Sequence, residues 1–306
     1  MTPPAVEIAA HAKVNLLLRV LARETTGYHT LETVFCLVEL ADRLTAARTA
    51  TRGIDLTVDG PDLGPVEDNL AYRAAGAVLE ATGHPFGIRL HLEKHIPTQA
   101  GLGGGSADAA AALHAVNALT GGAIPRHELL QFAAKLGADV TFCASGAPLA
   151  LAWGRGERLF RLDPPKPAPV LIAVPPVGIA TRKAYEALAR GRTDPVFRGG
   201  MVLDDDAFRT WGGIGRLGGN DFESTVFAKE PAIRELFERI AETRPLLVRM
   251  TGSGSGIVAI YKSDPERDGA AMVVGEQKQR LIKTTTRSTP APAPAALDVP
   301  NAPSTG

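Results

Sequence analysis

Apolar residues alternate with other residues along the first part of the chain. Every even-numbered position over 8–18 is apolar, which is the pattern of a β-strand with one face in the core. Lys13 and Asn15 then lie together on the other face of this strand. A turn at 26–29 and a second strand over 31–40 follow. The pattern therefore predicts two strands, with a lysine and an asparagine side by side on one strand face.

The same alternation predicts a third strand over 88–96, where one polar residue breaks the pattern. Lys94 shares the register of the apolar residues, whereas the other polar residues of this segment lie on the opposite face. A lysine on an apolar face requires a buried partner, unless its long side chain reaches water from the end of the strand. The pattern leaves both interpretations of Lys94 open.

Helical patterns surround this third strand. A helix is predicted over 69–81, with Asp68 as a candidate cap, and an alanine-rich helix is predicted over 106–120. Another helix over 127–136 ends at a glycine, which places Asp139 shortly after the helix end. A proline and a glycine-rich loop separate the third strand from the alanine-rich helix. The chain therefore presents a strand, a glycine-rich loop and a helix in that order.

A proline-dense segment at 163–169 marks the predicted boundary between two domains. We predict an N-terminal domain over 1–163, a C-terminal domain over 164–283 and a disordered tail over 284–306. The tail is rich in Pro, Ala, Ser and Thr, and its side chains bury too little apolar surface to offset the entropy of ordering. Within the C-terminal domain, a loose glycine-rich excursion is predicted over 191–220.

Composition contributes mainly by excluding classes of protein. The 306 residues are 45% hydrophobic and 22% charged, which is typical of a globular protein with a large core. Lys and Arg together number 33, as do Asp and Glu, so no overall charge attracts nucleic acid or an acidic membrane surface. The sequence shows neither a signal-like start nor an apolar run of about 18 residues, so we expect a cytoplasmic protein without a nucleic-acid or membrane partner. Cys36 and Cys143 are expected to be reduced thiols with a packing role.

The glycine-rich loop carries the strongest chemical signal in the chain. Its four glycines over 100–105 allow a ligand to approach the backbone, and the following helix offers unpaired N–H groups and the positive end of its dipole. Phosphate is the anion that suits this geometry best. The residues around the glycines differ from the P-loop and dinucleotide-binding patterns. Glycine-rich turns also precede helices that bind nothing, so the spacing alone leaves phosphate binding open.

Three segments, in order along the chain, resemble the motifs of the superfamily of galactokinase, homoserine kinase, mevalonate kinase and phosphomevalonate kinase, the GHMP kinases. They are Ala12-Lys-Val-Asn15, Pro97-Thr-Gln-Ala-Gly-Leu-Gly-Gly-Gly-Ser106 and Thr251-Gly-Ser-Gly-Ser-Gly256. The resemblance implies an α+β fold with an N-terminal mixed α/β domain, a C-terminal ferredoxin-like domain and the active site in the cleft between them. It also implies that ATP and Mg²⁺ bind at the loop, with the metal ligands unassigned. The residues that it assigns to the nucleotide are Asn69, Lys94, Pro97, Ala100, Gly101, Leu102, Gly103, Gly104, Gly105 and Ser106.

Further motifs narrow the resemblance to one branch of this superfamily. They are Gly27-Tyr-His29, Gly137-Ala-Asp139 and Asn220-Asp-Phe-Glu223. The branch phosphorylates the 2-hydroxyl of a methylerythritol that carries a cytidine diphosphate, in the non-mevalonate route to isoprenoid precursors. The resemblance therefore implies an ATP-dependent kinase with an alcohol acceptor and a small-molecule substrate. It assigns Tyr28 and His29 to the cytosine, with Tyr185 as a second aromatic face.

The resemblance assigns the chemistry to Lys13 and Asp139. A carboxylate within hydrogen-bond reach of an alcohol accepts its proton as the bond to phosphorus forms. A neighbouring lysine stabilises the charge that develops during the transfer. Asp139 is therefore the expected base, Lys13 its partner, and Asn15 the residue that orients the substrate.

Simpler interpretations exist for these residues. Asp139 and Ser106 can be helix caps, Lys13 can be a solvated strand residue and Tyr185 can be a core aromatic. The alternative functions are a sister kinase for homoserine, mevalonate or a sugar, and a catalytically silent ligand-binding homologue. The alanine-rich terminal helix of the family has no visible counterpart after Tyr261. The sequence leaves the oligomeric state, monomer or homodimer, open.

Overall fold

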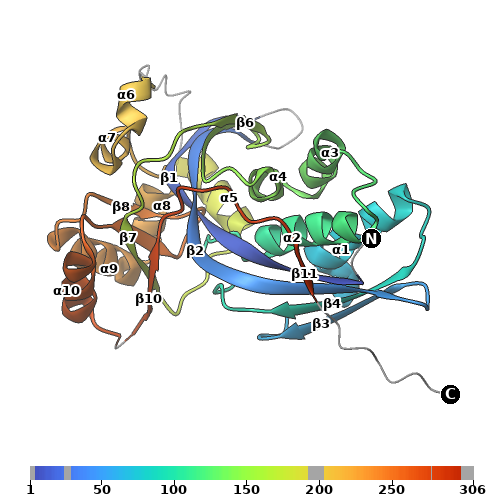
Figure 1. Ribbon diagram of the computed structural model, residues 1–306. Helices are drawn as coiled ribbons and strands as arrows, with labels where there is room; N and C mark the ends of the chain where they lie inside the picture. The colour runs from blue at the N-terminus through green and yellow to red at the C-terminus, as the bar shows by residue number, and fades with distance from the viewer. Residues whose placement is uncertain (1–3, 24–28, 192–202, 277, 298–306) are drawn as a thin grey trace.

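The computed structural model describes residues 4–23, 29–191, 203–276 and 278–297, and these form two lobes (Figure 1). Each lobe is built on one β-sheet, and helices accompany both sheets. This is the α+β architecture of two domains that the sequence predicted. The predicted division at residue 163 stays a prediction.

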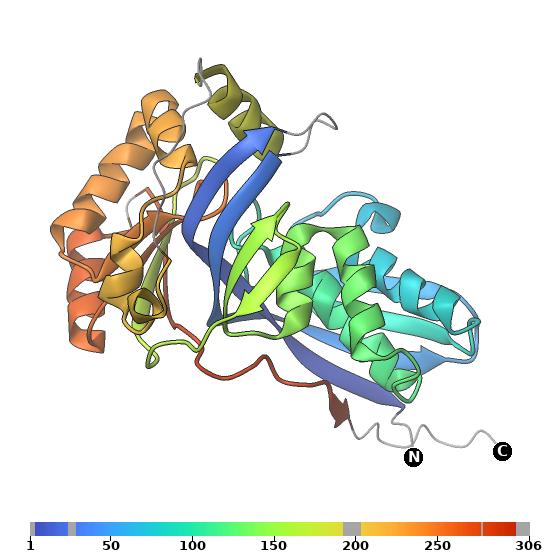
Figure 2. The same ribbon diagram turned by 90° about the horizontal axis from the view of Figure 1, so that it is seen from above.

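The sheet of the first lobe has seven strands in the described part of the chain. The strand order is β11-β1-β2-β4-β3, while β5 pairs with β2 and β6 pairs with β5. β3 and β4 run parallel, whereas the other neighbouring strands described are antiparallel. The strands are β1 (Ala5–Arg23), β2 (His29–Thr49), β3 (Ile54–Asp59), β4 (Gly87–Glu93), β5 (Leu149–Gly154), β6 (Arg158–Arg161) and β11 (Ala295–Leu297). Helices on one side of the sheet, seen in Figures 1 and 2, are α1 (Leu70–Ala81), α2 (Gly104–Leu119), α3 (Arg126–Leu136) and α4 (Ala138–Ser145), and a short 3₁₀ turn covers Val66–Asp68.

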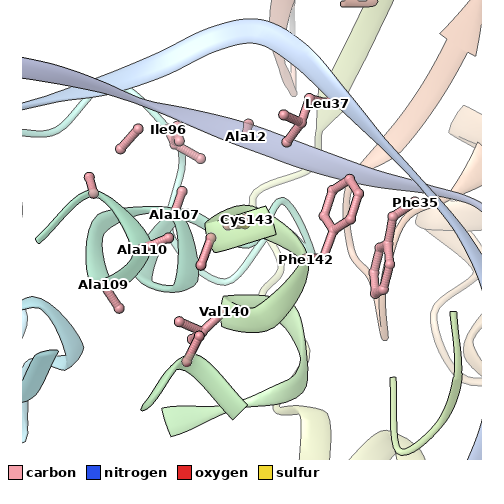
Figure 3. Close-up of a cluster of buried hydrophobic side chains, with 14 of the residues drawn as sticks. Ala12, Phe35, Leu37, Ile96, Ala107, Ala109, Ala110, Val140, Phe142 and Cys143 are labelled. Atoms are coloured by element: carbon pink, nitrogen blue, oxygen red, sulfur yellow. The ribbon is translucent and has the colours of Figure 1, made fainter. Parts of the chain in front are cut away.

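Small side chains allow helix α2 to lie close to the sheet. Figure 3 shows the alanines of α2 in one cluster with side chains of α4, β1 and β2. Within this cluster the rings of Phe35 and Phe142 stack with their centroids 4.8 Å apart. The packing fixes the starts of α2 and α4 relative to β1, because a close-packed core tolerates little displacement. These three elements carry several of the candidate site residues, among them Lys13, Asn15 and Asp139.

Strand β1 is irregular where it passes the candidate site. Its pairing with β2 shifts between His11 and Lys13, and the backbone N–H of Lys13 donates instead to the carbonyl oxygen of Leu102 at 3.0 Å. A bulge of this kind bends a strand and re-aims its side chains. The sequence predicted burial of one strand face, but Lys13 and Asn15 on the other face are buried too. The prediction was wrong here because the glycine-rich loop covers that second face.

The second lobe has a four-stranded antiparallel sheet in the order β10-β7-β9-β8. Its strands are β7 (Pro169–Val174), β8 (Leu247–Met250), β9 (Ile257–Ile260) and β10 (Arg280–Thr285). Its helices are α5 (Thr181–Gly191), α6 (Asp205–Phe208), α7 (Trp211–Arg216), α8 (Phe222–Lys229), α9 (Pro231–Glu242) and α10 (Asp264–Val274). This order of strands, with helices before β8 and before β10, is the ferredoxin-like arrangement that was predicted. Helix α10 corrects the expectation that no terminal helix follows the β9 strand, and α6 and α7 occupy the predicted excursion over 191–220, of which 192–202 lie outside the described residues.

Three predicted element ends differ from the structure. β2 is longer than the predicted 31–40 because it pairs with β1, β4 and β5 along its length. Helix α2 begins two residues before Ser106, since Gly103 adopts the left-handed conformation and serves as the N-cap. β4 ends at Glu93, so Lys94 follows the strand.

The predicted disorder of the tail is wrong for 284–297, whereas 298–306 lie outside the described residues. Beyond β10, the backbone N–H of Arg287 donates to Leu37 at 2.9 Å, and that of Ala291 donates to Gly146 at 3.0 Å. β11 then pairs with the start of β1. The composition argument considered only the apolar surface of the tail, whereas its order comes from backbone hydrogen bonds to strands and turns that are already folded. We call residues 287–297 the strap. The strap joins the sheet of the second lobe to the edge of the first sheet, as Figure 2 shows.

A chain shortened to end at Thr286 is expected to be less stable than the full chain. Loss of the strap removes the hydrogen bonds of Arg287, Ala291 and β11, so we expect the free energy of unfolding in urea to fall by about 2–4 kcal/mol. The control is a chain that ends at Leu297, which keeps every described contact of the strap. Equal unfolding midpoints for the two shortened chains would show that the strap contributes nothing to stability.

Candidate active site

A cavity of about 610 Å³ opens between the glycine-rich loop, β1, α4 and the second lobe. Its walls include every residue that the sequence assigned to a site except Tyr28, which lies outside the described residues, and His29. The lining residues that were assigned are Lys13, Asn15, Asn69, Lys94, Pro97, Ala100, Gly101, Leu102, Gly103, Gly104, Gly105, Ser106, Asp139 and Tyr185. Residues far apart in the sequence therefore surround one space. Their roles in binding and chemistry stay predictions.

Lys13 and Asp139 form an ion pair on the wall of this cavity. The Nζ atom of Lys13 lies 3.1 Å from Oδ2 of Asp139, and the side chains are 4% and 36% exposed. Lys13 is therefore not a solvated strand residue. Asp139 is the second residue of α4, whose N-cap is Gly137, so its carboxylate does not cap this helix. The carboxylate instead faces the cavity, near the positive end of the helix dipole.

Asn15 connects this ion pair to the second lobe. Its side-chain oxygen accepts from Lys13 Nζ at 2.8 Å and from the backbone N–H of Gly252 at 3.0 Å, and its nitrogen donates to Thr33 Oγ1 at 2.8 Å. Thr33 in turn donates to a backbone carbonyl of β1. Asn15 is 2% exposed, so these protein contacts hold it in place. The structure thus gives Asn15 a task in fixing Lys13, beside the predicted contact with substrate.

The glycines of the loop are required by close approaches as well as by backbone conformation. Gly101 has φ +73°, and a Cβ atom there would lie 2.0 Å from the carbonyl oxygen of Thr251. Gly103 has φ +69°, and its Cβ would lie 2.8 Å from Cγ of Lys13. Because Gly103 is the N-cap of α2, Ser106 is the third helical residue and the cap interpretation of its hydroxyl is wrong. The N–H groups of the first turn of α2 point toward the loop, at the wall of the cavity.

The turn after β8 holds the loop from the side of the second lobe. Thr251 Oγ1 donates to the carbonyl oxygen of Gly101 at 3.0 Å and accepts from the backbone N–H of Asn15 at 3.1 Å. Asn220 Nδ2 donates to the carbonyl oxygens of Met250 and Gly252, both at 2.7 Å. The Thr-Gly-Ser-Gly motif and the Asn-Asp-Phe-Glu motif found in the sequence therefore meet at one junction between the lobes.

The rings of Tyr185 and Phe222 line another part of the cavity, and the ring of His29, which does not line it, packs against Tyr185. The ring of Tyr185 lies 4.9 Å from that of His29 and 4.8 Å from that of Phe222. Burial, with a further contribution from the Asp139 carboxylate, raises the pKa of Tyr185 to about 12, so its hydroxyl remains a hydrogen-bond donor. Tyr185 packs against the core, which confirms the core interpretation, and it also borders the cavity, while its contact with a nucleobase stays a prediction. Phe222 was missed as a site residue, although it lies within the Asn-Asp-Phe-Glu motif.

Asn69 and Lys94 have internal contacts as well as a place on the cavity wall. Asn69, rather than the predicted Asp68, caps α1, because its side chain accepts from the backbone N–H of Ala71. The ammonium group of Lys94 pairs with Asp42 and Asp108, so the snorkelling interpretation is wrong and the inward one is confirmed. The odd register of Lys94 indicated a buried partner, but nothing in the local pattern identified Asp42.

Burial shifts the pKa values of one carboxyl group on the cavity wall and of two thiols in the core. Burial raises the pKa of Asp108 to about 7, while Lys94 lowers it and Asp42 raises it. Burial also raises the pKa of the Cys36 and Cys143 thiols, which stay protonated as expected for packing residues.

Within the described residues, no His, Cys, Asp and Glu side chains form a group of three or more arranged to hold a metal. No helix in the described part of the chain is long and apolar enough to cross a bilayer.

Family models and relatives agree with this geometry. Residues 69–147 match the GHMP kinases N terminal domain, and residues 206–277 match the GHMP kinases C terminal domain. The 4-diphosphocytidyl-2-C-methyl-D-erythritol kinase of Pelotomaculum thermopropionicum is 39% identical over 90% of this chain and 96% of the relative. The kinase of the same name from Parvibaculum lavamentivorans is 38% identical over 90% of this chain and 94% of the relative.

Solved structures give the same result. A crystal structure of 4-(cytidine 5'-diphospho)-2C-methyl-D-erythritol kinase has a TM-score of 0.75 and 36% identity, covering 91% of this chain and 98% of that chain. Homoserine kinase from Cytophaga hutchinsonii also has a TM-score of 0.75, over 97% of this chain and 98% of that chain. At 20% identity, the homoserine kinase shows the shared fold alone.

The close approach at Gly101 predicts opposite effects for two glycine-to-alanine substitutions in one loop. Gly101→Ala forces a left-handed alanine against the Thr251 carbonyl, so the free energy of unfolding is expected to fall by about 2 kcal/mol or more. Gly105→Ala adds a methyl group in open space within α2, and stability is expected to rise by up to about 1 kcal/mol. Urea unfolding of both variants tests this. Equal stability of the two variants would contradict the contact between loop and turn.

Proposed function

This chain belongs to the GHMP kinases, in the branch of the 4-diphosphocytidyl-2-C-methyl-D-erythritol kinases, and from that membership we propose how its residues carry out the reaction. It is an ATP-dependent kinase that phosphorylates the 2-hydroxyl of 4-diphosphocytidyl-2-C-methyl-D-erythritol, a step in the formation of isoprenoid precursors. The assignment of individual residues to binding and catalysis is our proposal. The 3.1 Å ion pair of Lys13 and Asp139 on the cavity wall, next to the glycine-rich loop, is the observation that carries it.

Asp139 is the base in this proposal. Its carboxylate is the partly exposed member of the ion pair, so it can accept the proton of an alcohol that enters the cavity. As the oxygen–phosphorus bond forms, negative charge spreads over the transferred group, and the Lys13 ammonium lies where it stabilises that charge. Asn15 and Thr33 fix the lysine, so the ion pair needs no rearrangement when the substrates bind.

The glycine-rich loop and the first turn of α2 bind the ATP phosphates in this proposal. The cavity borders Gly103, Gly104 and Gly105, where helix N–H groups and the helix dipole favour an anion. Mg²⁺ in such sites is held largely by phosphate oxygens and water, with one or two protein oxygens, and when bound it neutralises phosphate charge. Ser106, whose hydroxyl is not used as a helix cap, fits the role of such an oxygen ligand.

The cytidine diphosphate group of the acceptor binds on the aromatic side of the cavity. Tyr185, His29 and Phe222 form a continuous set of rings, and a pyrimidine offers a flat face for stacking on them. The protonated Tyr185 hydroxyl and the His29 imidazole supply hydrogen bonds for its edge. Homoserine, mevalonate and simple sugars have no such face, which favours the cytidyl substrate over those of sister kinases. The absence of a nucleic-acid or membrane partner and a cytoplasmic location stay predictions from the sequence, and the oligomeric state, monomer or homodimer, stays open.

Asp139→Asn is expected to lower kcat by about 100- to 10,000-fold with little change in the KM values of ATP and the acceptor. The amide keeps the size of the carboxylate but cannot accept the proton. Steady-state kinetics with ATP and the diphosphocytidyl alcohol measure the effect. Asp55→Asn, an exposed carboxylate on β3, is the matched control and should keep wild-type kinetics. Near-full turnover by the Asp139 variant would refute the base assignment, whereas an inactive wild-type chain would refute the function itself.

Tyr185→Ala is expected to raise the KM of the diphosphocytidyl alcohol by about tenfold or more and to leave the KM of ATP within about twofold. The stacking face is lost while the phosphate-binding loop stays intact. Tyr185→Phe retains the ring and should bind the acceptor much more tightly than the alanine variant. A panel of acceptors that includes homoserine and mevalonate shows whether the cytidyl preference depends on this ring. Unchanged preference in Tyr185→Ala would remove Tyr185 from the nucleobase site.

A further inference from the structure

A buried cluster of three charged side chains lies beneath the glycine-rich loop. Lys94 Nζ contacts Oδ2 of Asp108 at 2.6 Å and also contacts Oδ2 of Asp42. The side chains of Lys94, Asp42 and Asp108 are 3%, 0% and 1% exposed. They come from three elements, because Asp42 belongs to β2, Lys94 follows β4 and Asp108 belongs to α2. We call these three residues the basal triad.

The basal triad binds the chain segments that precede and follow the glycine-rich loop. Asp42 Oδ1 accepts from the backbone N–H groups of His95 at 2.5 Å and Ile96 at 2.8 Å, immediately before the loop begins at Pro97. Asp108 lies in α2, immediately after the loop ends. Because Lys94 binds both carboxylates, one set of contacts ties the entry of the loop to its exit. The loop is thereby fixed at its base independently of the Thr251 contact at its tip.

The Lys94 side chain of the triad also lies close to the backbone that is proposed to bind phosphate. A Cβ atom on Gly104, the first residue of α2, would lie 3.3 Å from Lys94 Nζ and 3.2 Å from Cγ2 of Ile96. The Lys94 side chain borders the cavity but is only 3% exposed, so its ammonium would act on a bound nucleotide mainly through the backbone of this turn and through its field. This differs from the direct contact with nucleotide that the sequence resemblance implied for Lys94.

Stability alone does not account for a cluster of this kind. Removing charges from water is costly, and buried ion clusters are often replaced by apolar side chains with no loss of stability. In addition, Oδ1 of Asp108 is buried without a hydrogen-bond partner among the described residues, which is an unfavourable arrangement. This charged cluster has an unsatisfied oxygen and lies against the first turn of α2. We therefore expect it to have a role in the phosphate binding proposed for that turn.

We propose that Asp42 and Asp108 are positioning residues for ATP, which hold the Lys94 ammonium against the start of α2 and so fix the loop in its phosphate-binding form. The proposal rests on the proposed function, because it deepens the account of the same nucleotide site. Its effect is confined to the nucleotide side of the cavity. The aromatic residues that are proposed to bind the acceptor lie on the other side and are not in contact with the triad in any described interaction.

Binding of MgATP in the absence of acceptor tests this inference without depending on the identity of the alcohol. In Asp108→Ala the lysine loses one of its two anchors, so we expect the dissociation constant of MgATP, measured by calorimetry, to rise about tenfold. The KM of the acceptor should change by less than about twofold. Asp108→Asn keeps an oxygen for Lys94 and an amide that can face Asp42, so it should restore most of the affinity. Asp163→Ala, an exposed carboxylate in the segment before β7, is the control.

An apolar replacement separates positioning from stability. The combined variant Asp42→Asn, Lys94→Met and Asp108→Leu keeps an acceptor for the two N–H groups before Pro97 and removes every charge of the triad. We expect its urea midpoint to match or exceed that of Asp108→Ala, while its MgATP affinity falls at least as far. Hydrogen exchange provides a further readout on both variants: amides over 98–106 in the loop and the start of α2 should exchange faster, whereas those of the second sheet should not.

The outcomes distinguish failure of this inference from failure of the proposed function. A wild-type chain that binds no MgATP would overturn both. A wild-type chain that binds MgATP, together with an Asp108→Ala variant of equal affinity and equal loop exchange, would overturn the positioning role alone. Equal losses in the affinity for MgATP and for the acceptor would also overturn it, because they would indicate a general loss of structure.

Discussion

Direct contact between two glycine-rich turns, one from each lobe, fixes how closely the two lobes of this molecule approach each other. The carbonyl oxygen of Thr251, from the second lobe, occupies the space where a side chain on Gly101 of the first lobe would begin. Thr251 also binds the Gly101 carbonyl and the backbone of Asn15. Because backbone meets backbone here, the separation between the lobes is set by atoms that cannot change rotamer. The bulge in β1 belongs to the same contact, since it frees the Lys13 N–H for the loop.

In the proposed function, the site attracts the phosphates of ATP through its local geometry. The chain has equal numbers of acidic and basic residues, so its overall charge gives no attraction to a nucleotide. Attraction comes from the unpaired N–H groups at the start of α2 and from two lysines held nearby. Each lysine is buried and paired with carboxylates, which prevents it from moving freely toward a ligand. The cationic charge is therefore fixed in place before any substrate arrives, and such preorganisation is a main source of catalytic power.

The two sides of the cavity differ in chemistry in a way that matches a two-substrate reaction. Backbone N–H groups dominate the side formed by α2, whereas the side formed by α5 and α8 presents the rings of Tyr185 and Phe222. The Lys13–Asp139 pair lies between them, on β1 and α4. In the proposed function, the phosphate donor and the nucleobase-bearing acceptor therefore use separate surfaces, and the reacting groups meet at the ion pair. The strap over 287–297 lies outside this cavity and contributes through the stability of the lobes that enclose it.

The sequence by itself determined many of the elements and indicated the chemistry proposed for the loop, because these depend on neighbours along the chain. Alternation identified β1, the run of alanines identified α2, and the glycines with the following helix indicated an anion site. The odd register of Lys94 indicated either a buried partner or a side chain that reaches water from the strand end. Tertiary structure alone decided which residues meet across long separations: Asp42 with Lys94, Thr251 with Gly101, and Phe222 with Tyr185. It also decided the burial of both faces of β1 and the order of the strap, since burial and backbone pairing depend on surfaces that other segments provide. Local patterns carry no information about such surfaces, which exist only once the chain has folded.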